Sequence, residues 1–353
     1  MKVDLSTVVI PLTAKIVDAL RVIDGSGLQV AVVIDANGLL KGLVTDGDVR
    51  RGLLRGLSLE ACVTEVMNAS PITLASDASQ EAVVGRIRQA GRRHVPVVDA
   101  AGKLVALEIV EAHISHQVAP SCALLMAGGL GQRLHPITET VPKPMIKVGD
   151  QPILERLIKH LLEQGIRRFY LSVNYKAEMI EEYFGDGHKW GAEISYLHEN
   201  ARLGTAGALG LLPEVPEGSF LLMNGDIMTS INLRQMMDYH LNHAAVMTIG
   251  AFAHEYQVPF GVLQMNGDQV AAIHEKPVIR KYVSGGVYTL APAVLEFVRR
   301  GEVLDMPSLI QRLIESNQKV SAFPIREYWI DIGRHDDLHR AGRDVQAMFP
   351  HTA

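Results

Sequence analysis

The chain has 353 residues, of which 48% are hydrophobic and 21% charged, and its formal net charge is −5 at pH 7. This length predicts two or three domains, and the apolar content excludes a disordered chain. The acidic balance, without a block of basic residues, disfavours nucleic acid as a partner. Cys62 and Cys122 stand far apart in the sequence, so we expect neither a disulfide framework nor a cysteine-based zinc site.

No stretch of the sequence predicts a membrane segment. No apolar run approaches the roughly 18 residues that a spanning helix needs. The first six residues lack the charged start, apolar segment and cleavage site of a signal peptide. We therefore expect a soluble cytoplasmic protein with no membrane partner.

The first third of the chain contains an internal repeat, in which residues 13–38 line up with residues 77–102. Each copy shows an amphipathic helix, a short apolar strand, a turn at Asp-x-x-Gly and a second strand. The helical signals fall at residues 16–23 and 83–90, and the strands that follow fall at 30–34 and 95–98. Because neither copy buries its apolar face alone, we expect the two to pair.

The segment after the first turn, residues 42–51, resembles the CBS domain, which works as a pair and often binds adenine nucleotides. The resemblance implies that Thr45 and Asp48 contact the ribose and phosphates of such a nucleotide. A carboxylate can accept two hydrogen bonds from a ribose diol, and a hydroxyl can bond a phosphate. The second copy has Ile109 and Ala112 at these positions, so we expect one competent site rather than two.

A structural interpretation of Thr45 and Asp48 stays open. Both residue types are favoured at the start of a helix, which is predicted here over residues 49–54. In that case the CBS pair has a structural or dimerising role.

After a polar linker at residues 113–121, apolar strands alternate with helices. The predicted domains are 1–117, made of copies at about 1–62 and 63–117, and 121–353. The predicted strands are 122–126, 169–173, 194–197, 220–223, 245–251 and 287–290, and the predicted helices are 153–163, 177–184, 233–241, 293–297 and 307–316. This alternation predicts an α/β class: an α+β pair followed by a Rossmann-like domain with a mostly parallel sheet covered on both faces.

A glycine-rich loop follows the first strand of the second domain. It reads Ala127-Gly128-Gly129-Leu130-Gly131, with Arg133 just beyond it and Lys143 later, between two prolines. Glycine lets the backbone approach a phosphate, and the loop N–H groups can point at its oxygens. The loop matches neither the G-x-G-x-x-G spacing nor a Walker A motif, so alone it indicates only a phosphate site.

Later motifs narrow the class of protein. The chain carries, in order, Pro142-Lys143-Pro144-Met145, Glu199, Leu203-Gly204-Thr205-Ala206-Gly207-Ala208, Asn224-Gly225-Asp226, Glu275-Lys276-Pro277, Ser284-Gly285-Gly286-Val287-Tyr288 and Trp329-Ile330-Asp331-Ile332-Gly333. With the glycine loop, this set resembles the sugar-1-phosphate nucleotidyltransferase family over about 121–340. The resemblance implies attack by a sugar-1-phosphate oxygen on the α-phosphorus of an NTP. Because both reactants are anions, the protein has to neutralise charge and align them.

The resemblance also implies roles for individual residues. Arg133 would grip the triphosphate, and Lys143 would bridge the reacting phosphates. Asp226 and Asp331 would hold Mg²⁺, which takes one or two carboxylates together with phosphate oxygens and water. The other implied contacts are Ala127, Gly128, Gly129, Gly131, Gly204, Thr205 and Ala206 for the nucleotide, and Asn174, Glu199, Glu275, Lys276 and Gly286 for the sugar phosphate.

Most of these roles have structural alternatives. Asp331 has apolar neighbours in the sequence, which favours ligation because an unpaired buried carboxylate is costly. The alternatives are a surface ion pair for Arg133, a solvated loop lysine for Lys143, a turn or helix cap for Asp226, a salt bridge between Glu275 and Lys276, a helix cap at 204–207 and a bulge at 285–286.

We therefore expect a Mg²⁺-dependent enzyme that acts on an NTP and a sugar-1-phosphate, works as a homo-oligomer (dimer or tetramer), and uses its CBS pair as an adenine-nucleotide regulatory module. A CBS pair ahead of this domain resembles glucosamine-1-phosphate guanylyltransferases of legionaminate-type pathways. That resemblance favours GTP, a hexosamine-type 1-phosphate and a role in cell-surface glycan synthesis. Transfer from dTTP, UTP or CTP, another acceptor, or a catalytically idle regulatory subunit stays open.

Overall fold

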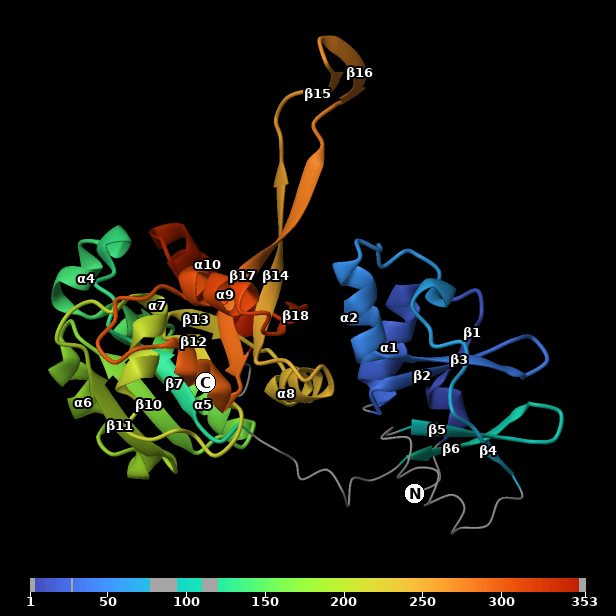
Figure 1. Cartoon of the computed structure of the whole chain (residues 1–353), viewed down its shortest axis with the longest axis horizontal. Coiled ribbons are helices and arrows are strands. Elements are labelled where there is room, and N and C mark those ends of the chain that lie inside the picture. The colour runs from blue at the N-terminus through green and yellow to red at the C-terminus, as the bar shows by residue number, and fades with distance from the viewer. Residues whose placement is uncertain (1–3, 27, 77–93, 110–119, 349–353) are drawn as a thin grey trace. The chain divides into compact units, whose positions relative to one another are not determined.

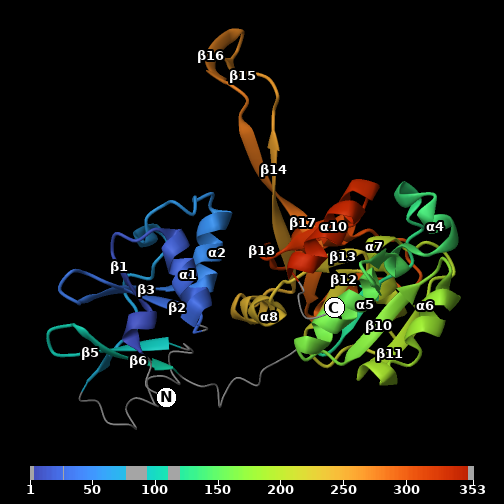
Figure 2. The ribbon, with the colours of Figure 1, turned by 180° about the vertical axis from the view of Figure 1, so that it is seen from behind.

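The computed structural model describes residues 4–26, 28–76, 94–109 and 120–348. The chain divides into two compact units, Met1–Gln117 and Val118–Ala353. They are coloured blue to teal and green to red in Figure 1, and Figure 2 shows them from behind. Within the described residues, no helix has both the length and the apolar sequence needed to cross a bilayer.

The first unit contains the same strand arrangement twice. In each copy the first strand pairs parallel with the second, which pairs antiparallel with the third. The strands are β1 (Val9–Pro11), β2 (Val30–Ile34) and β3 (Leu40–Thr45), then β4 (Leu74–Ala75), β5 (His94–Val98) and β6 (Leu104–Ile109). The helices are α1 (Ile16–Ser26) and α2 (Asp46–Leu54), with short 3₁₀ helices η1 (Leu5–Thr7) and η2 (Val63–Glu65). The predicted helix at 83–90 and Ala112 lie outside the described residues.

The turns of the two copies bond to each other. In each copy the turn aspartate accepts hydrogen bonds from backbone N–H groups two and four residues on. The turn glycines have φ angles of 79° and 81°, which explains glycine at both positions. Leu40 N–H donates to the Gly102 carbonyl and Leu104 N–H to the Gly38 carbonyl, each at 3.1 Å. The two copies therefore form one body, as the repeat predicted.

The second unit is built on a seven-stranded sheet in the order β11-β10-β7-β12-β17-β14-β18. The strands are β7 (Ala123–Met126), β10 (Arg168–Val173), β11 (Glu193–His198), β12 (Phe220–Asn224), β14 (Met247–Gln257), β17 (Val278–Leu290) and β18 (Val320–Ile325). The first four are mutually parallel, β17 runs antiparallel to both neighbours, and β14 and β18 are parallel. The mostly parallel sheet is confirmed, but strand–helix alternation did not predict the reversed β17.

Helices cover both faces of this sheet. Ala123 and Leu125 of β7 pack with α5 (Ile153–Glu163), α6 (Ala177–Phe184) and α8 (Leu233–Asn242). Leu124 faces the other way and packs with α7 (Gly204–Gly207) and α9 (Met306–Glu315). This alternation follows from the two-residue period of a strand. The predicted helix at 293–297 is a 3₁₀ helix, η7 (Pro292–Phe297), which lies on the second face with η6 (Ala208–Leu211).

Smaller elements complete the second unit. They are α4 (Ile137–Thr140), α10 (His335–Met348), η3 (Gln132–Leu134), η4 (Lys143–Met145), η5 (His188–Trp190) and the strand pairs β8 (Lys147–Val148) with β9 (Gln151–Pro152), β13 (Ile227–Thr229) with β19 (Trp329–Asp331), and β15 (Val262–Asn266) with β16 (Gln269–His274). Strands β14 and β17 are longer than predicted. They extend out of the α/β body as a hairpin whose tip is the β15–β16 pair, visible in Figures 1 and 2.

Candidate active site

The glycine loop starts where β7 ends and is held closely by its neighbours. Ala127 N–H donates to the Ser172 carbonyl at 2.8 Å. A Cβ on Gly128 would lie 3.2 Å from Glu199 Oε1, and one on Gly131 would lie 2.7 Å from Thr138 Cγ2. Gly131 also has a φ of 62°. The space and the backbone conformation therefore require glycine at 131.

Lys143 is buried below this loop rather than solvated. It begins η4 after Pro142, and its side chain is only 9% exposed. Its Nζ lies 2.5 Å from Asp226 Oδ2 and 3.8 Å from Asp331 Oδ1. The structure thus brings together three of the predicted residues, which we call the Lys143 cluster: Lys143, Asp226 and Asp331.

Strand pairing positions the two carboxylates. Asp226 follows β12, and Gly225 N–H donates to the Met126 carbonyl at 2.9 Å. Strand β13 then pairs antiparallel with β19, so that Ile227 lies opposite Asp331. Ile332 N–H donates to the Asp226 carbonyl at 3.2 Å, which fixes the register.

The cluster has unused acceptor capacity. Asp226 Oδ1 and Asp331 Oδ1 are both buried and have no hydrogen-bond partner among the described residues. Burial raises the pKa of Asp331 above its ordinary value, the Asp226 carboxylate raises it further, and Lys143 and Arg133 oppose the shift. Buried carboxylate oxygens without donors are costly. A cation between them would remove that cost.

The donor set fits Mg²⁺. Magnesium commonly uses one or two protein carboxylates and completes its octahedron with phosphate oxygens and water. Asp226 and Asp331 supply two such oxygens without donors. Across the described ranges, no group of three or more His, Cys, Asp and Glu residues is placed to hold a metal. The arrangement therefore suits an ion that takes its other ligands from a substrate.

Arg133 lies at the mouth of the cluster. It belongs to η3 and is exposed, while its neighbour Leu134 is buried and anchors the turn. A Cβ on Gly333 would lie 3.5 Å from Arg133 Nη1, so the guanidinium lies beside the segment that follows Asp331. It forms no ion pair with any residue that the structure describes, which leaves its charge available to a ligand.

Asn174 and Glu199 lie together at the ends of β10 and β11, beside Gly128. Asn174 Nδ2 donates to the Glu199 carbonyl at 2.5 Å. The Glu199 carboxylate accepts from Leu203 N–H at 3.2 Å and from the Ser172 hydroxyl. Ser172 was missed from the sequence, although a serine near the end of an apolar strand could have indicated it. This carboxylate is committed to structure on both of its oxygens.

The Gly204–Gly207 segment is bound to the start of α9. Thr205 N–H donates to Asp305 Oδ1 at 3.1 Å, and Met306 N–H donates to Thr205 Oγ1 at 2.8 Å. Gly204 has a φ of 77°, and a Cβ there would lie 2.7 Å from Asp305 Oδ1. The side chain of Thr205 therefore serves the start of α9, whereas the helix that begins at Gly204 has no side-chain cap of its own. Asp305 was missed, although an Asp just before Met306-Pro307 is typical of a helix start.

Gly286 lies beside the cluster in a bulge. The register of β14 with β17 shifts between Ile249 and Ala251, opposite Gly285 and Gly286. Gly286 has a φ of 66°, and a Cβ there would lie 2.7 Å from Asn224 Nδ2. The predicted bulge is confirmed, and it places Gly286 against Asn224, the last residue of β12, two positions before Asp226.

Glu275 and Lys276 are not brought to the cluster. Both are exposed and lie between β16 and β17, on the hairpin that projects from the body in Figures 1 and 2. The Lys276 carbonyl accepts from Gln257 Nε2 at 3.2 Å, and Lys276 has a φ of 46°. The two side chains form no ion pair with each other, so the salt-bridge alternative is wrong for this conformation.

In the first unit, Thr45 and Asp48 form a capping box at the start of α2. Asp48 Oδ2 accepts from Thr45 N–H at 2.9 Å and from Thr45 Oγ1 at 2.6 Å, while Thr45 Oγ1 accepts from Asp48 N–H at 3.3 Å. Arg51 pairs with the other carboxylate oxygen. The helix begins at Asp46 rather than at residue 49. The capping interpretation is confirmed, so a nucleotide would have to share these groups.

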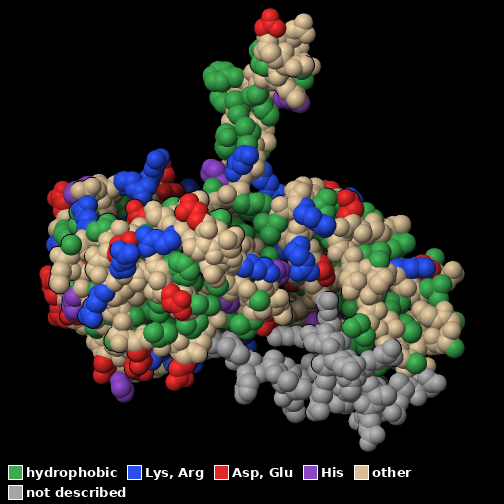
Figure 3. Space-filling view, in the orientation of Figure 1, with side chains coloured by type: hydrophobic (Ala, Val, Ile, Leu, Met, Phe, Trp, Pro, Cys, Tyr) green, Lys and Arg blue, Asp and Glu red, His purple; other side chains and the backbone are tan. Residues whose placement is uncertain are grey.

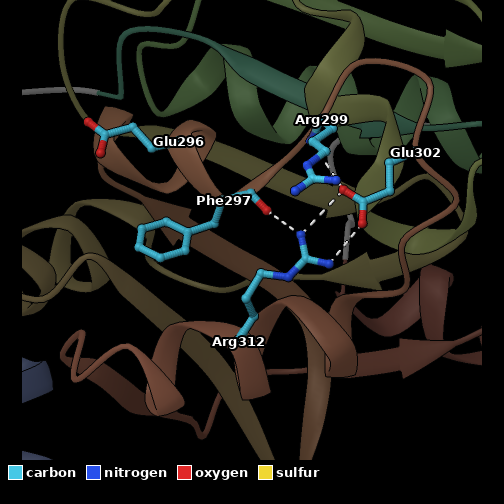
Figure 4. A pocket seen from close by; sticks show the side chains of 5 residues that line it. All are labelled: Glu296, Phe297, Arg299, Glu302 and Arg312. Carbon is cyan, nitrogen blue, oxygen red and sulfur yellow. Dashed lines mark hydrogen bonds and ion pairs between the residues drawn. The ribbon is translucent and has the colours of Figure 1, made fainter.

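A separate hollow of about 380 Å³ lies between η7 and α9 and contains none of the predicted site residues. Figure 4 shows Arg312 pointing at Glu302, with Phe297 and Arg299 beside them. Arg312 donates to the Phe297 carbonyl at 2.6 Å and to Glu302 at 2.8 Å. The hydrogen bond from Arg312 lowers the pKa of Glu302 to about 2. The bond to the Phe297 carbonyl joins α9 to η7, and the ion pair with Glu302 occupies the remaining charge of Arg312.

Comparison with known proteins identifies the class. Residues 122–348 match the nucleotidyl transferase family, and residues 4–55 and 63–107 each match the CBS domain. The chain therefore belongs to the nucleotidyl transferase family and carries a CBS pair. The predicted family and fold are confirmed.

Individual relatives differ in the base they use. The chain is 32% identical over 229 residues to the D-glycero-alpha-D-manno-heptose 1-phosphate guanylyltransferase of Aneurinibacillus thermoaerophilus, covering 64% of this chain and 98% of that one. It is 29% identical over 243 residues to the UTP–glucose-1-phosphate uridylyltransferase of Synechocystis, covering 63% of each. The chain thus spans under two thirds of the Synechocystis protein.

Among solved structures, HddC from Yersinia pseudotuberculosis superimposes with a TM-score of 0.51 at 27% identity, covering 63% of this chain and 98% of that one. A structure of HddC complexed with GMP-PN superimposes with a TM-score of 0.50.

Proposed function

We propose that the protein transfers a nucleotidyl group from an NTP to a sugar-1-phosphate and releases pyrophosphate. The Lys143 cluster carries this proposal. It holds a buried ammonium between two carboxylates, at the carboxyl ends of β7 and β12, where ligands of such sheets bind. Such a site is suited to reactions between two phosphates, which need fixed positive charge more than a protein nucleophile.

In the proposed reaction, a phosphate oxygen of the sugar-1-phosphate attacks the α-phosphorus of the NTP. One P–O bond forms there, the bond from the α-phosphorus to the bridging oxygen breaks, and pyrophosphate leaves with that electron pair. The attacking phosphate is already ionised, so no general base is required. The glycine loop seats the triphosphate, Arg133 neutralises the departing pyrophosphate, and Lys143 lies where negative charge builds on the α-phosphate.

Asp226 and Asp331 would hold Mg²⁺, which supplies positive charge to the phosphate oxygens when it is bound. Ala127, Gly128, Gly129, Gly131 and the Gly204–Ala206 turn would line the nucleotide. On the acceptor side we propose Asn174, Glu199, Gly286, Glu275 and Lys276. The side chains of Glu199 and Thr205 already form hydrogen bonds within the protein, so any ligand contact that they make would be shared with those bonds.

We propose GTP as the nucleotide and a hexosamine-type 1-phosphate as the acceptor. The heptose 1-phosphate guanylyltransferase and the GMP-PN complex of HddC support guanine. The uridylyltransferase relative supports UTP as the alternative. An idle regulatory subunit is disfavoured because Arg133, Lys143 and both aspartates are present and the last three converge.

We also propose that the CBS pair binds an adenine nucleotide through Thr45 and Asp48 and regulates transfer. Both side chains are half-buried at the start of α2, whose N-terminus favours phosphate. The second copy has Ile109 at the position of Thr45, which supports a single site.

A pyrophosphate-release screen tests the central proposal. The four NTPs are assayed with Mg²⁺ against a panel of hexose, hexosamine and heptose 1-phosphates, with Asp226→Asn as the blank. We expect one NTP–sugar pair to release pyrophosphate far faster than the others. Absence of release from every pair by the unmodified chain would contradict the function.

A further inference from the structure

Beyond the α/β body, β14 and β17 form a two-stranded ribbon with two free edges. Strand β18 accompanies β14 only as far as Phe252, and β12 accompanies β17 only from Val287 onward. The ladder between β14 and β17 continues from Ala251–Ser284 to Gln257–Val278 without a further break. We call residues 253–283, which include the β15–β16 tip, the arm.

The arm exposes an unusual amount of apolar surface. Of the fifteen large hydrophobic side chains exposed in the described residues, eight lie on it: Tyr256, Phe260, Leu263, Met265, Val270, Ile273, Val278 and Val283. At the tip, Leu263 pairs across with Ile273 and Met265 with Val270. Leu263 and Met265 are two positions apart on β15 and therefore share one face, while the register with β16 shifts between the two pairs. Figure 3 shows hydrophobic side chains along the arm.

A ribbon of this kind is poorly stabilised by itself. Two isolated strands are marginal in water, and stability needs a third strand or a packed face. Free strand edges also present unpaired N–H and C=O groups that favour pairing with another chain. The apolar face and the free strand edges of the arm are therefore typical of a segment that is buried against another protein surface.

Lys276 gives the arm a chemical role. Its φ of 46° is uncommon for a long side chain, and it precedes Pro277, so a defined turn presents the ammonium. It forms no ion pair with any described residue. The body supplies Arg133 and Lys143 to a triphosphate and an α-phosphate, and a sugar phosphate brings further negative charge. A further cation would balance that charge, and Lys276 is a lysine of the arm without an ion pair to any described residue.

We propose that the arm of one copy packs on the nucleotidyltransferase domain of a second copy and places Lys276 against the acceptor phosphate there. This inference rests on the proposed function. The unbroken ladder carries Lys276 out on the hairpin that projects from the body in Figures 1 and 2, and a second copy offers an identical acceptor site. Reciprocal exchange closes a two-fold dimer. The length of the arm matches the roughly 20–30 residues that a standard interface uses on each side.

Mixed assemblies test where Lys276 acts. Lys276→Ala and Asp226→Asn chains with different tags are co-expressed, and assemblies that carry both tags are purified. Exchange predicts about half of the wild-type rate, because one site of each pair then has an intact Asp226 and receives an intact Lys276. Each homomeric variant should be slower by about 100-fold. Lys281→Ala, a change of an exposed lysine on β17, is the matched control and should keep full activity.

The reciprocal mixture gives the opposite result. Wild-type chains are combined with chains that carry both Asp226→Asn and Lys276→Ala. Exchange predicts almost no activity, since the intact site receives the defective arm, whereas action within one chain predicts about half. The proposal would be overturned if the mixture of the two single variants were inactive while the mixture of wild-type and double-variant chains kept about half of the activity. An inactive wild type would instead count against the proposed function.

Cross-linking tests the docking without activity. Isotopically heavy and light chains are mixed under exchange conditions, and lysines are cross-linked and identified by mass spectrometry. We expect links from Lys276 or Lys281 to lysines of the body, such as Lys147 or Lys176, to join heavy with light peptides. Links within one isotope only, or no link between arm and body, would overturn the exchange.

Discussion

The ammonium of Lys143 lies 2.5 Å from Asp226 Oδ2, although 83 positions separate the two residues in the sequence. The contact exists because Lys143 follows the loop after β7, and β12 pairs directly with β7. Asp331 joins them because β19, which lies late in the sequence, pairs with β13 directly after Asp226. Three segments thus meet at the edge of the sheet where β7 leads into the glycine loop and β12 leads into Asp226.

Removing either member of the closest pair should abolish transfer. We expect Lys143→Ala and Asp226→Asn to slow pyrophosphate release by at least about 100-fold, because each removes charge that only this site supplies. Far-UV circular dichroism should stay unchanged. Lys147→Ala, at a nearby exposed lysine, is the control and should retain activity. Full activity in both cluster variants would refute the mechanism.

Asp331→Asn should stabilise the protein while inactivating it. Because the folded-state pKa of Asp331 is raised, its contribution to stability is present below the ordinary value of 3.8 and is lost as pH rises through the folded value. At neutral pH the charged group is therefore a cost, which asparagine removes. Calorimetry without Mg²⁺ should show a higher Tm for the variant at pH 7, and the difference should shrink toward pH 4. Asp336→Asn, an exposed change in α10, should show no such pattern.

Mg²⁺ should stabilise the wild-type chain through the two carboxylates. At a concentration about 100 times its Kd, linkage gives about 2.7 kcal/mol of stabilisation. We expect thermal unfolding to respond to Mg²⁺ in the wild type and in Asp336→Asn, and not in Asp226→Asn. An equal response in Asp226→Asn would place the ion elsewhere.

Two glycines of the loop should respond differently to alanine. Gly131→Ala meets Thr138 Cγ2 at 2.7 Å in a left-handed conformation, so it should cost about 1–3 kcal/mol of unfolding free energy. Gly129→Ala meets no atom within 4 Å, so stability should change by less than about 0.5 kcal/mol. NTP binding should nevertheless weaken, because the loop backbone has to approach the phosphates. Urea unfolding and NTP titration separate the two effects; unchanged NTP binding in Gly129→Ala would remove this loop from the nucleotide site.

Asp48→Ala should act on the first unit alone. Loss of the capping box should cost about 1 kcal/mol. Adenine-nucleotide affinity should fall by about tenfold with the lost charged acceptor, while pyrophosphate release without adenine nucleotide stays constant. Asp4→Ala, which removes the cap of η1, is the control for stability loss. Identical nucleotide titrations of the wild type and Asp48→Ala would leave Asp48 with capping alone.

Much of the fold could be predicted because its signals are local. The period of α1, the apolar run of β12 and the turn glycines at 38 and 102 each depend on neighbouring residues. The convergence of Lys143 with Asp226 was implied only by the order of motifs that resemble a family. No periodicity in the chain indicates it.

The remaining features depend on long-range pairing. The reversal of β17, the length of the arm and the pairing of β13 with β19 are set by contacts between distant segments. Thr205 illustrates the limit, since the choice between a ligand contact and a helix terminus depends on Asp305, one hundred positions away. Lys276 illustrates it again, because the motif that contains it lies on a hairpin far longer than the predicted strands.

The late position of β19 affects how the protein is made. A growing chain can form β7, the glycine loop, η4 and β12 while the ribosome is still adding the arm and α9. The second carboxylate of the cluster arrives only with residue 331. A product that stops earlier would keep the loop and Lys143 but lack half of the carboxylate pair. On the proposed function, the chain would therefore gain its complete carboxylate pair only when the nucleotidyltransferase domain is almost fully synthesised.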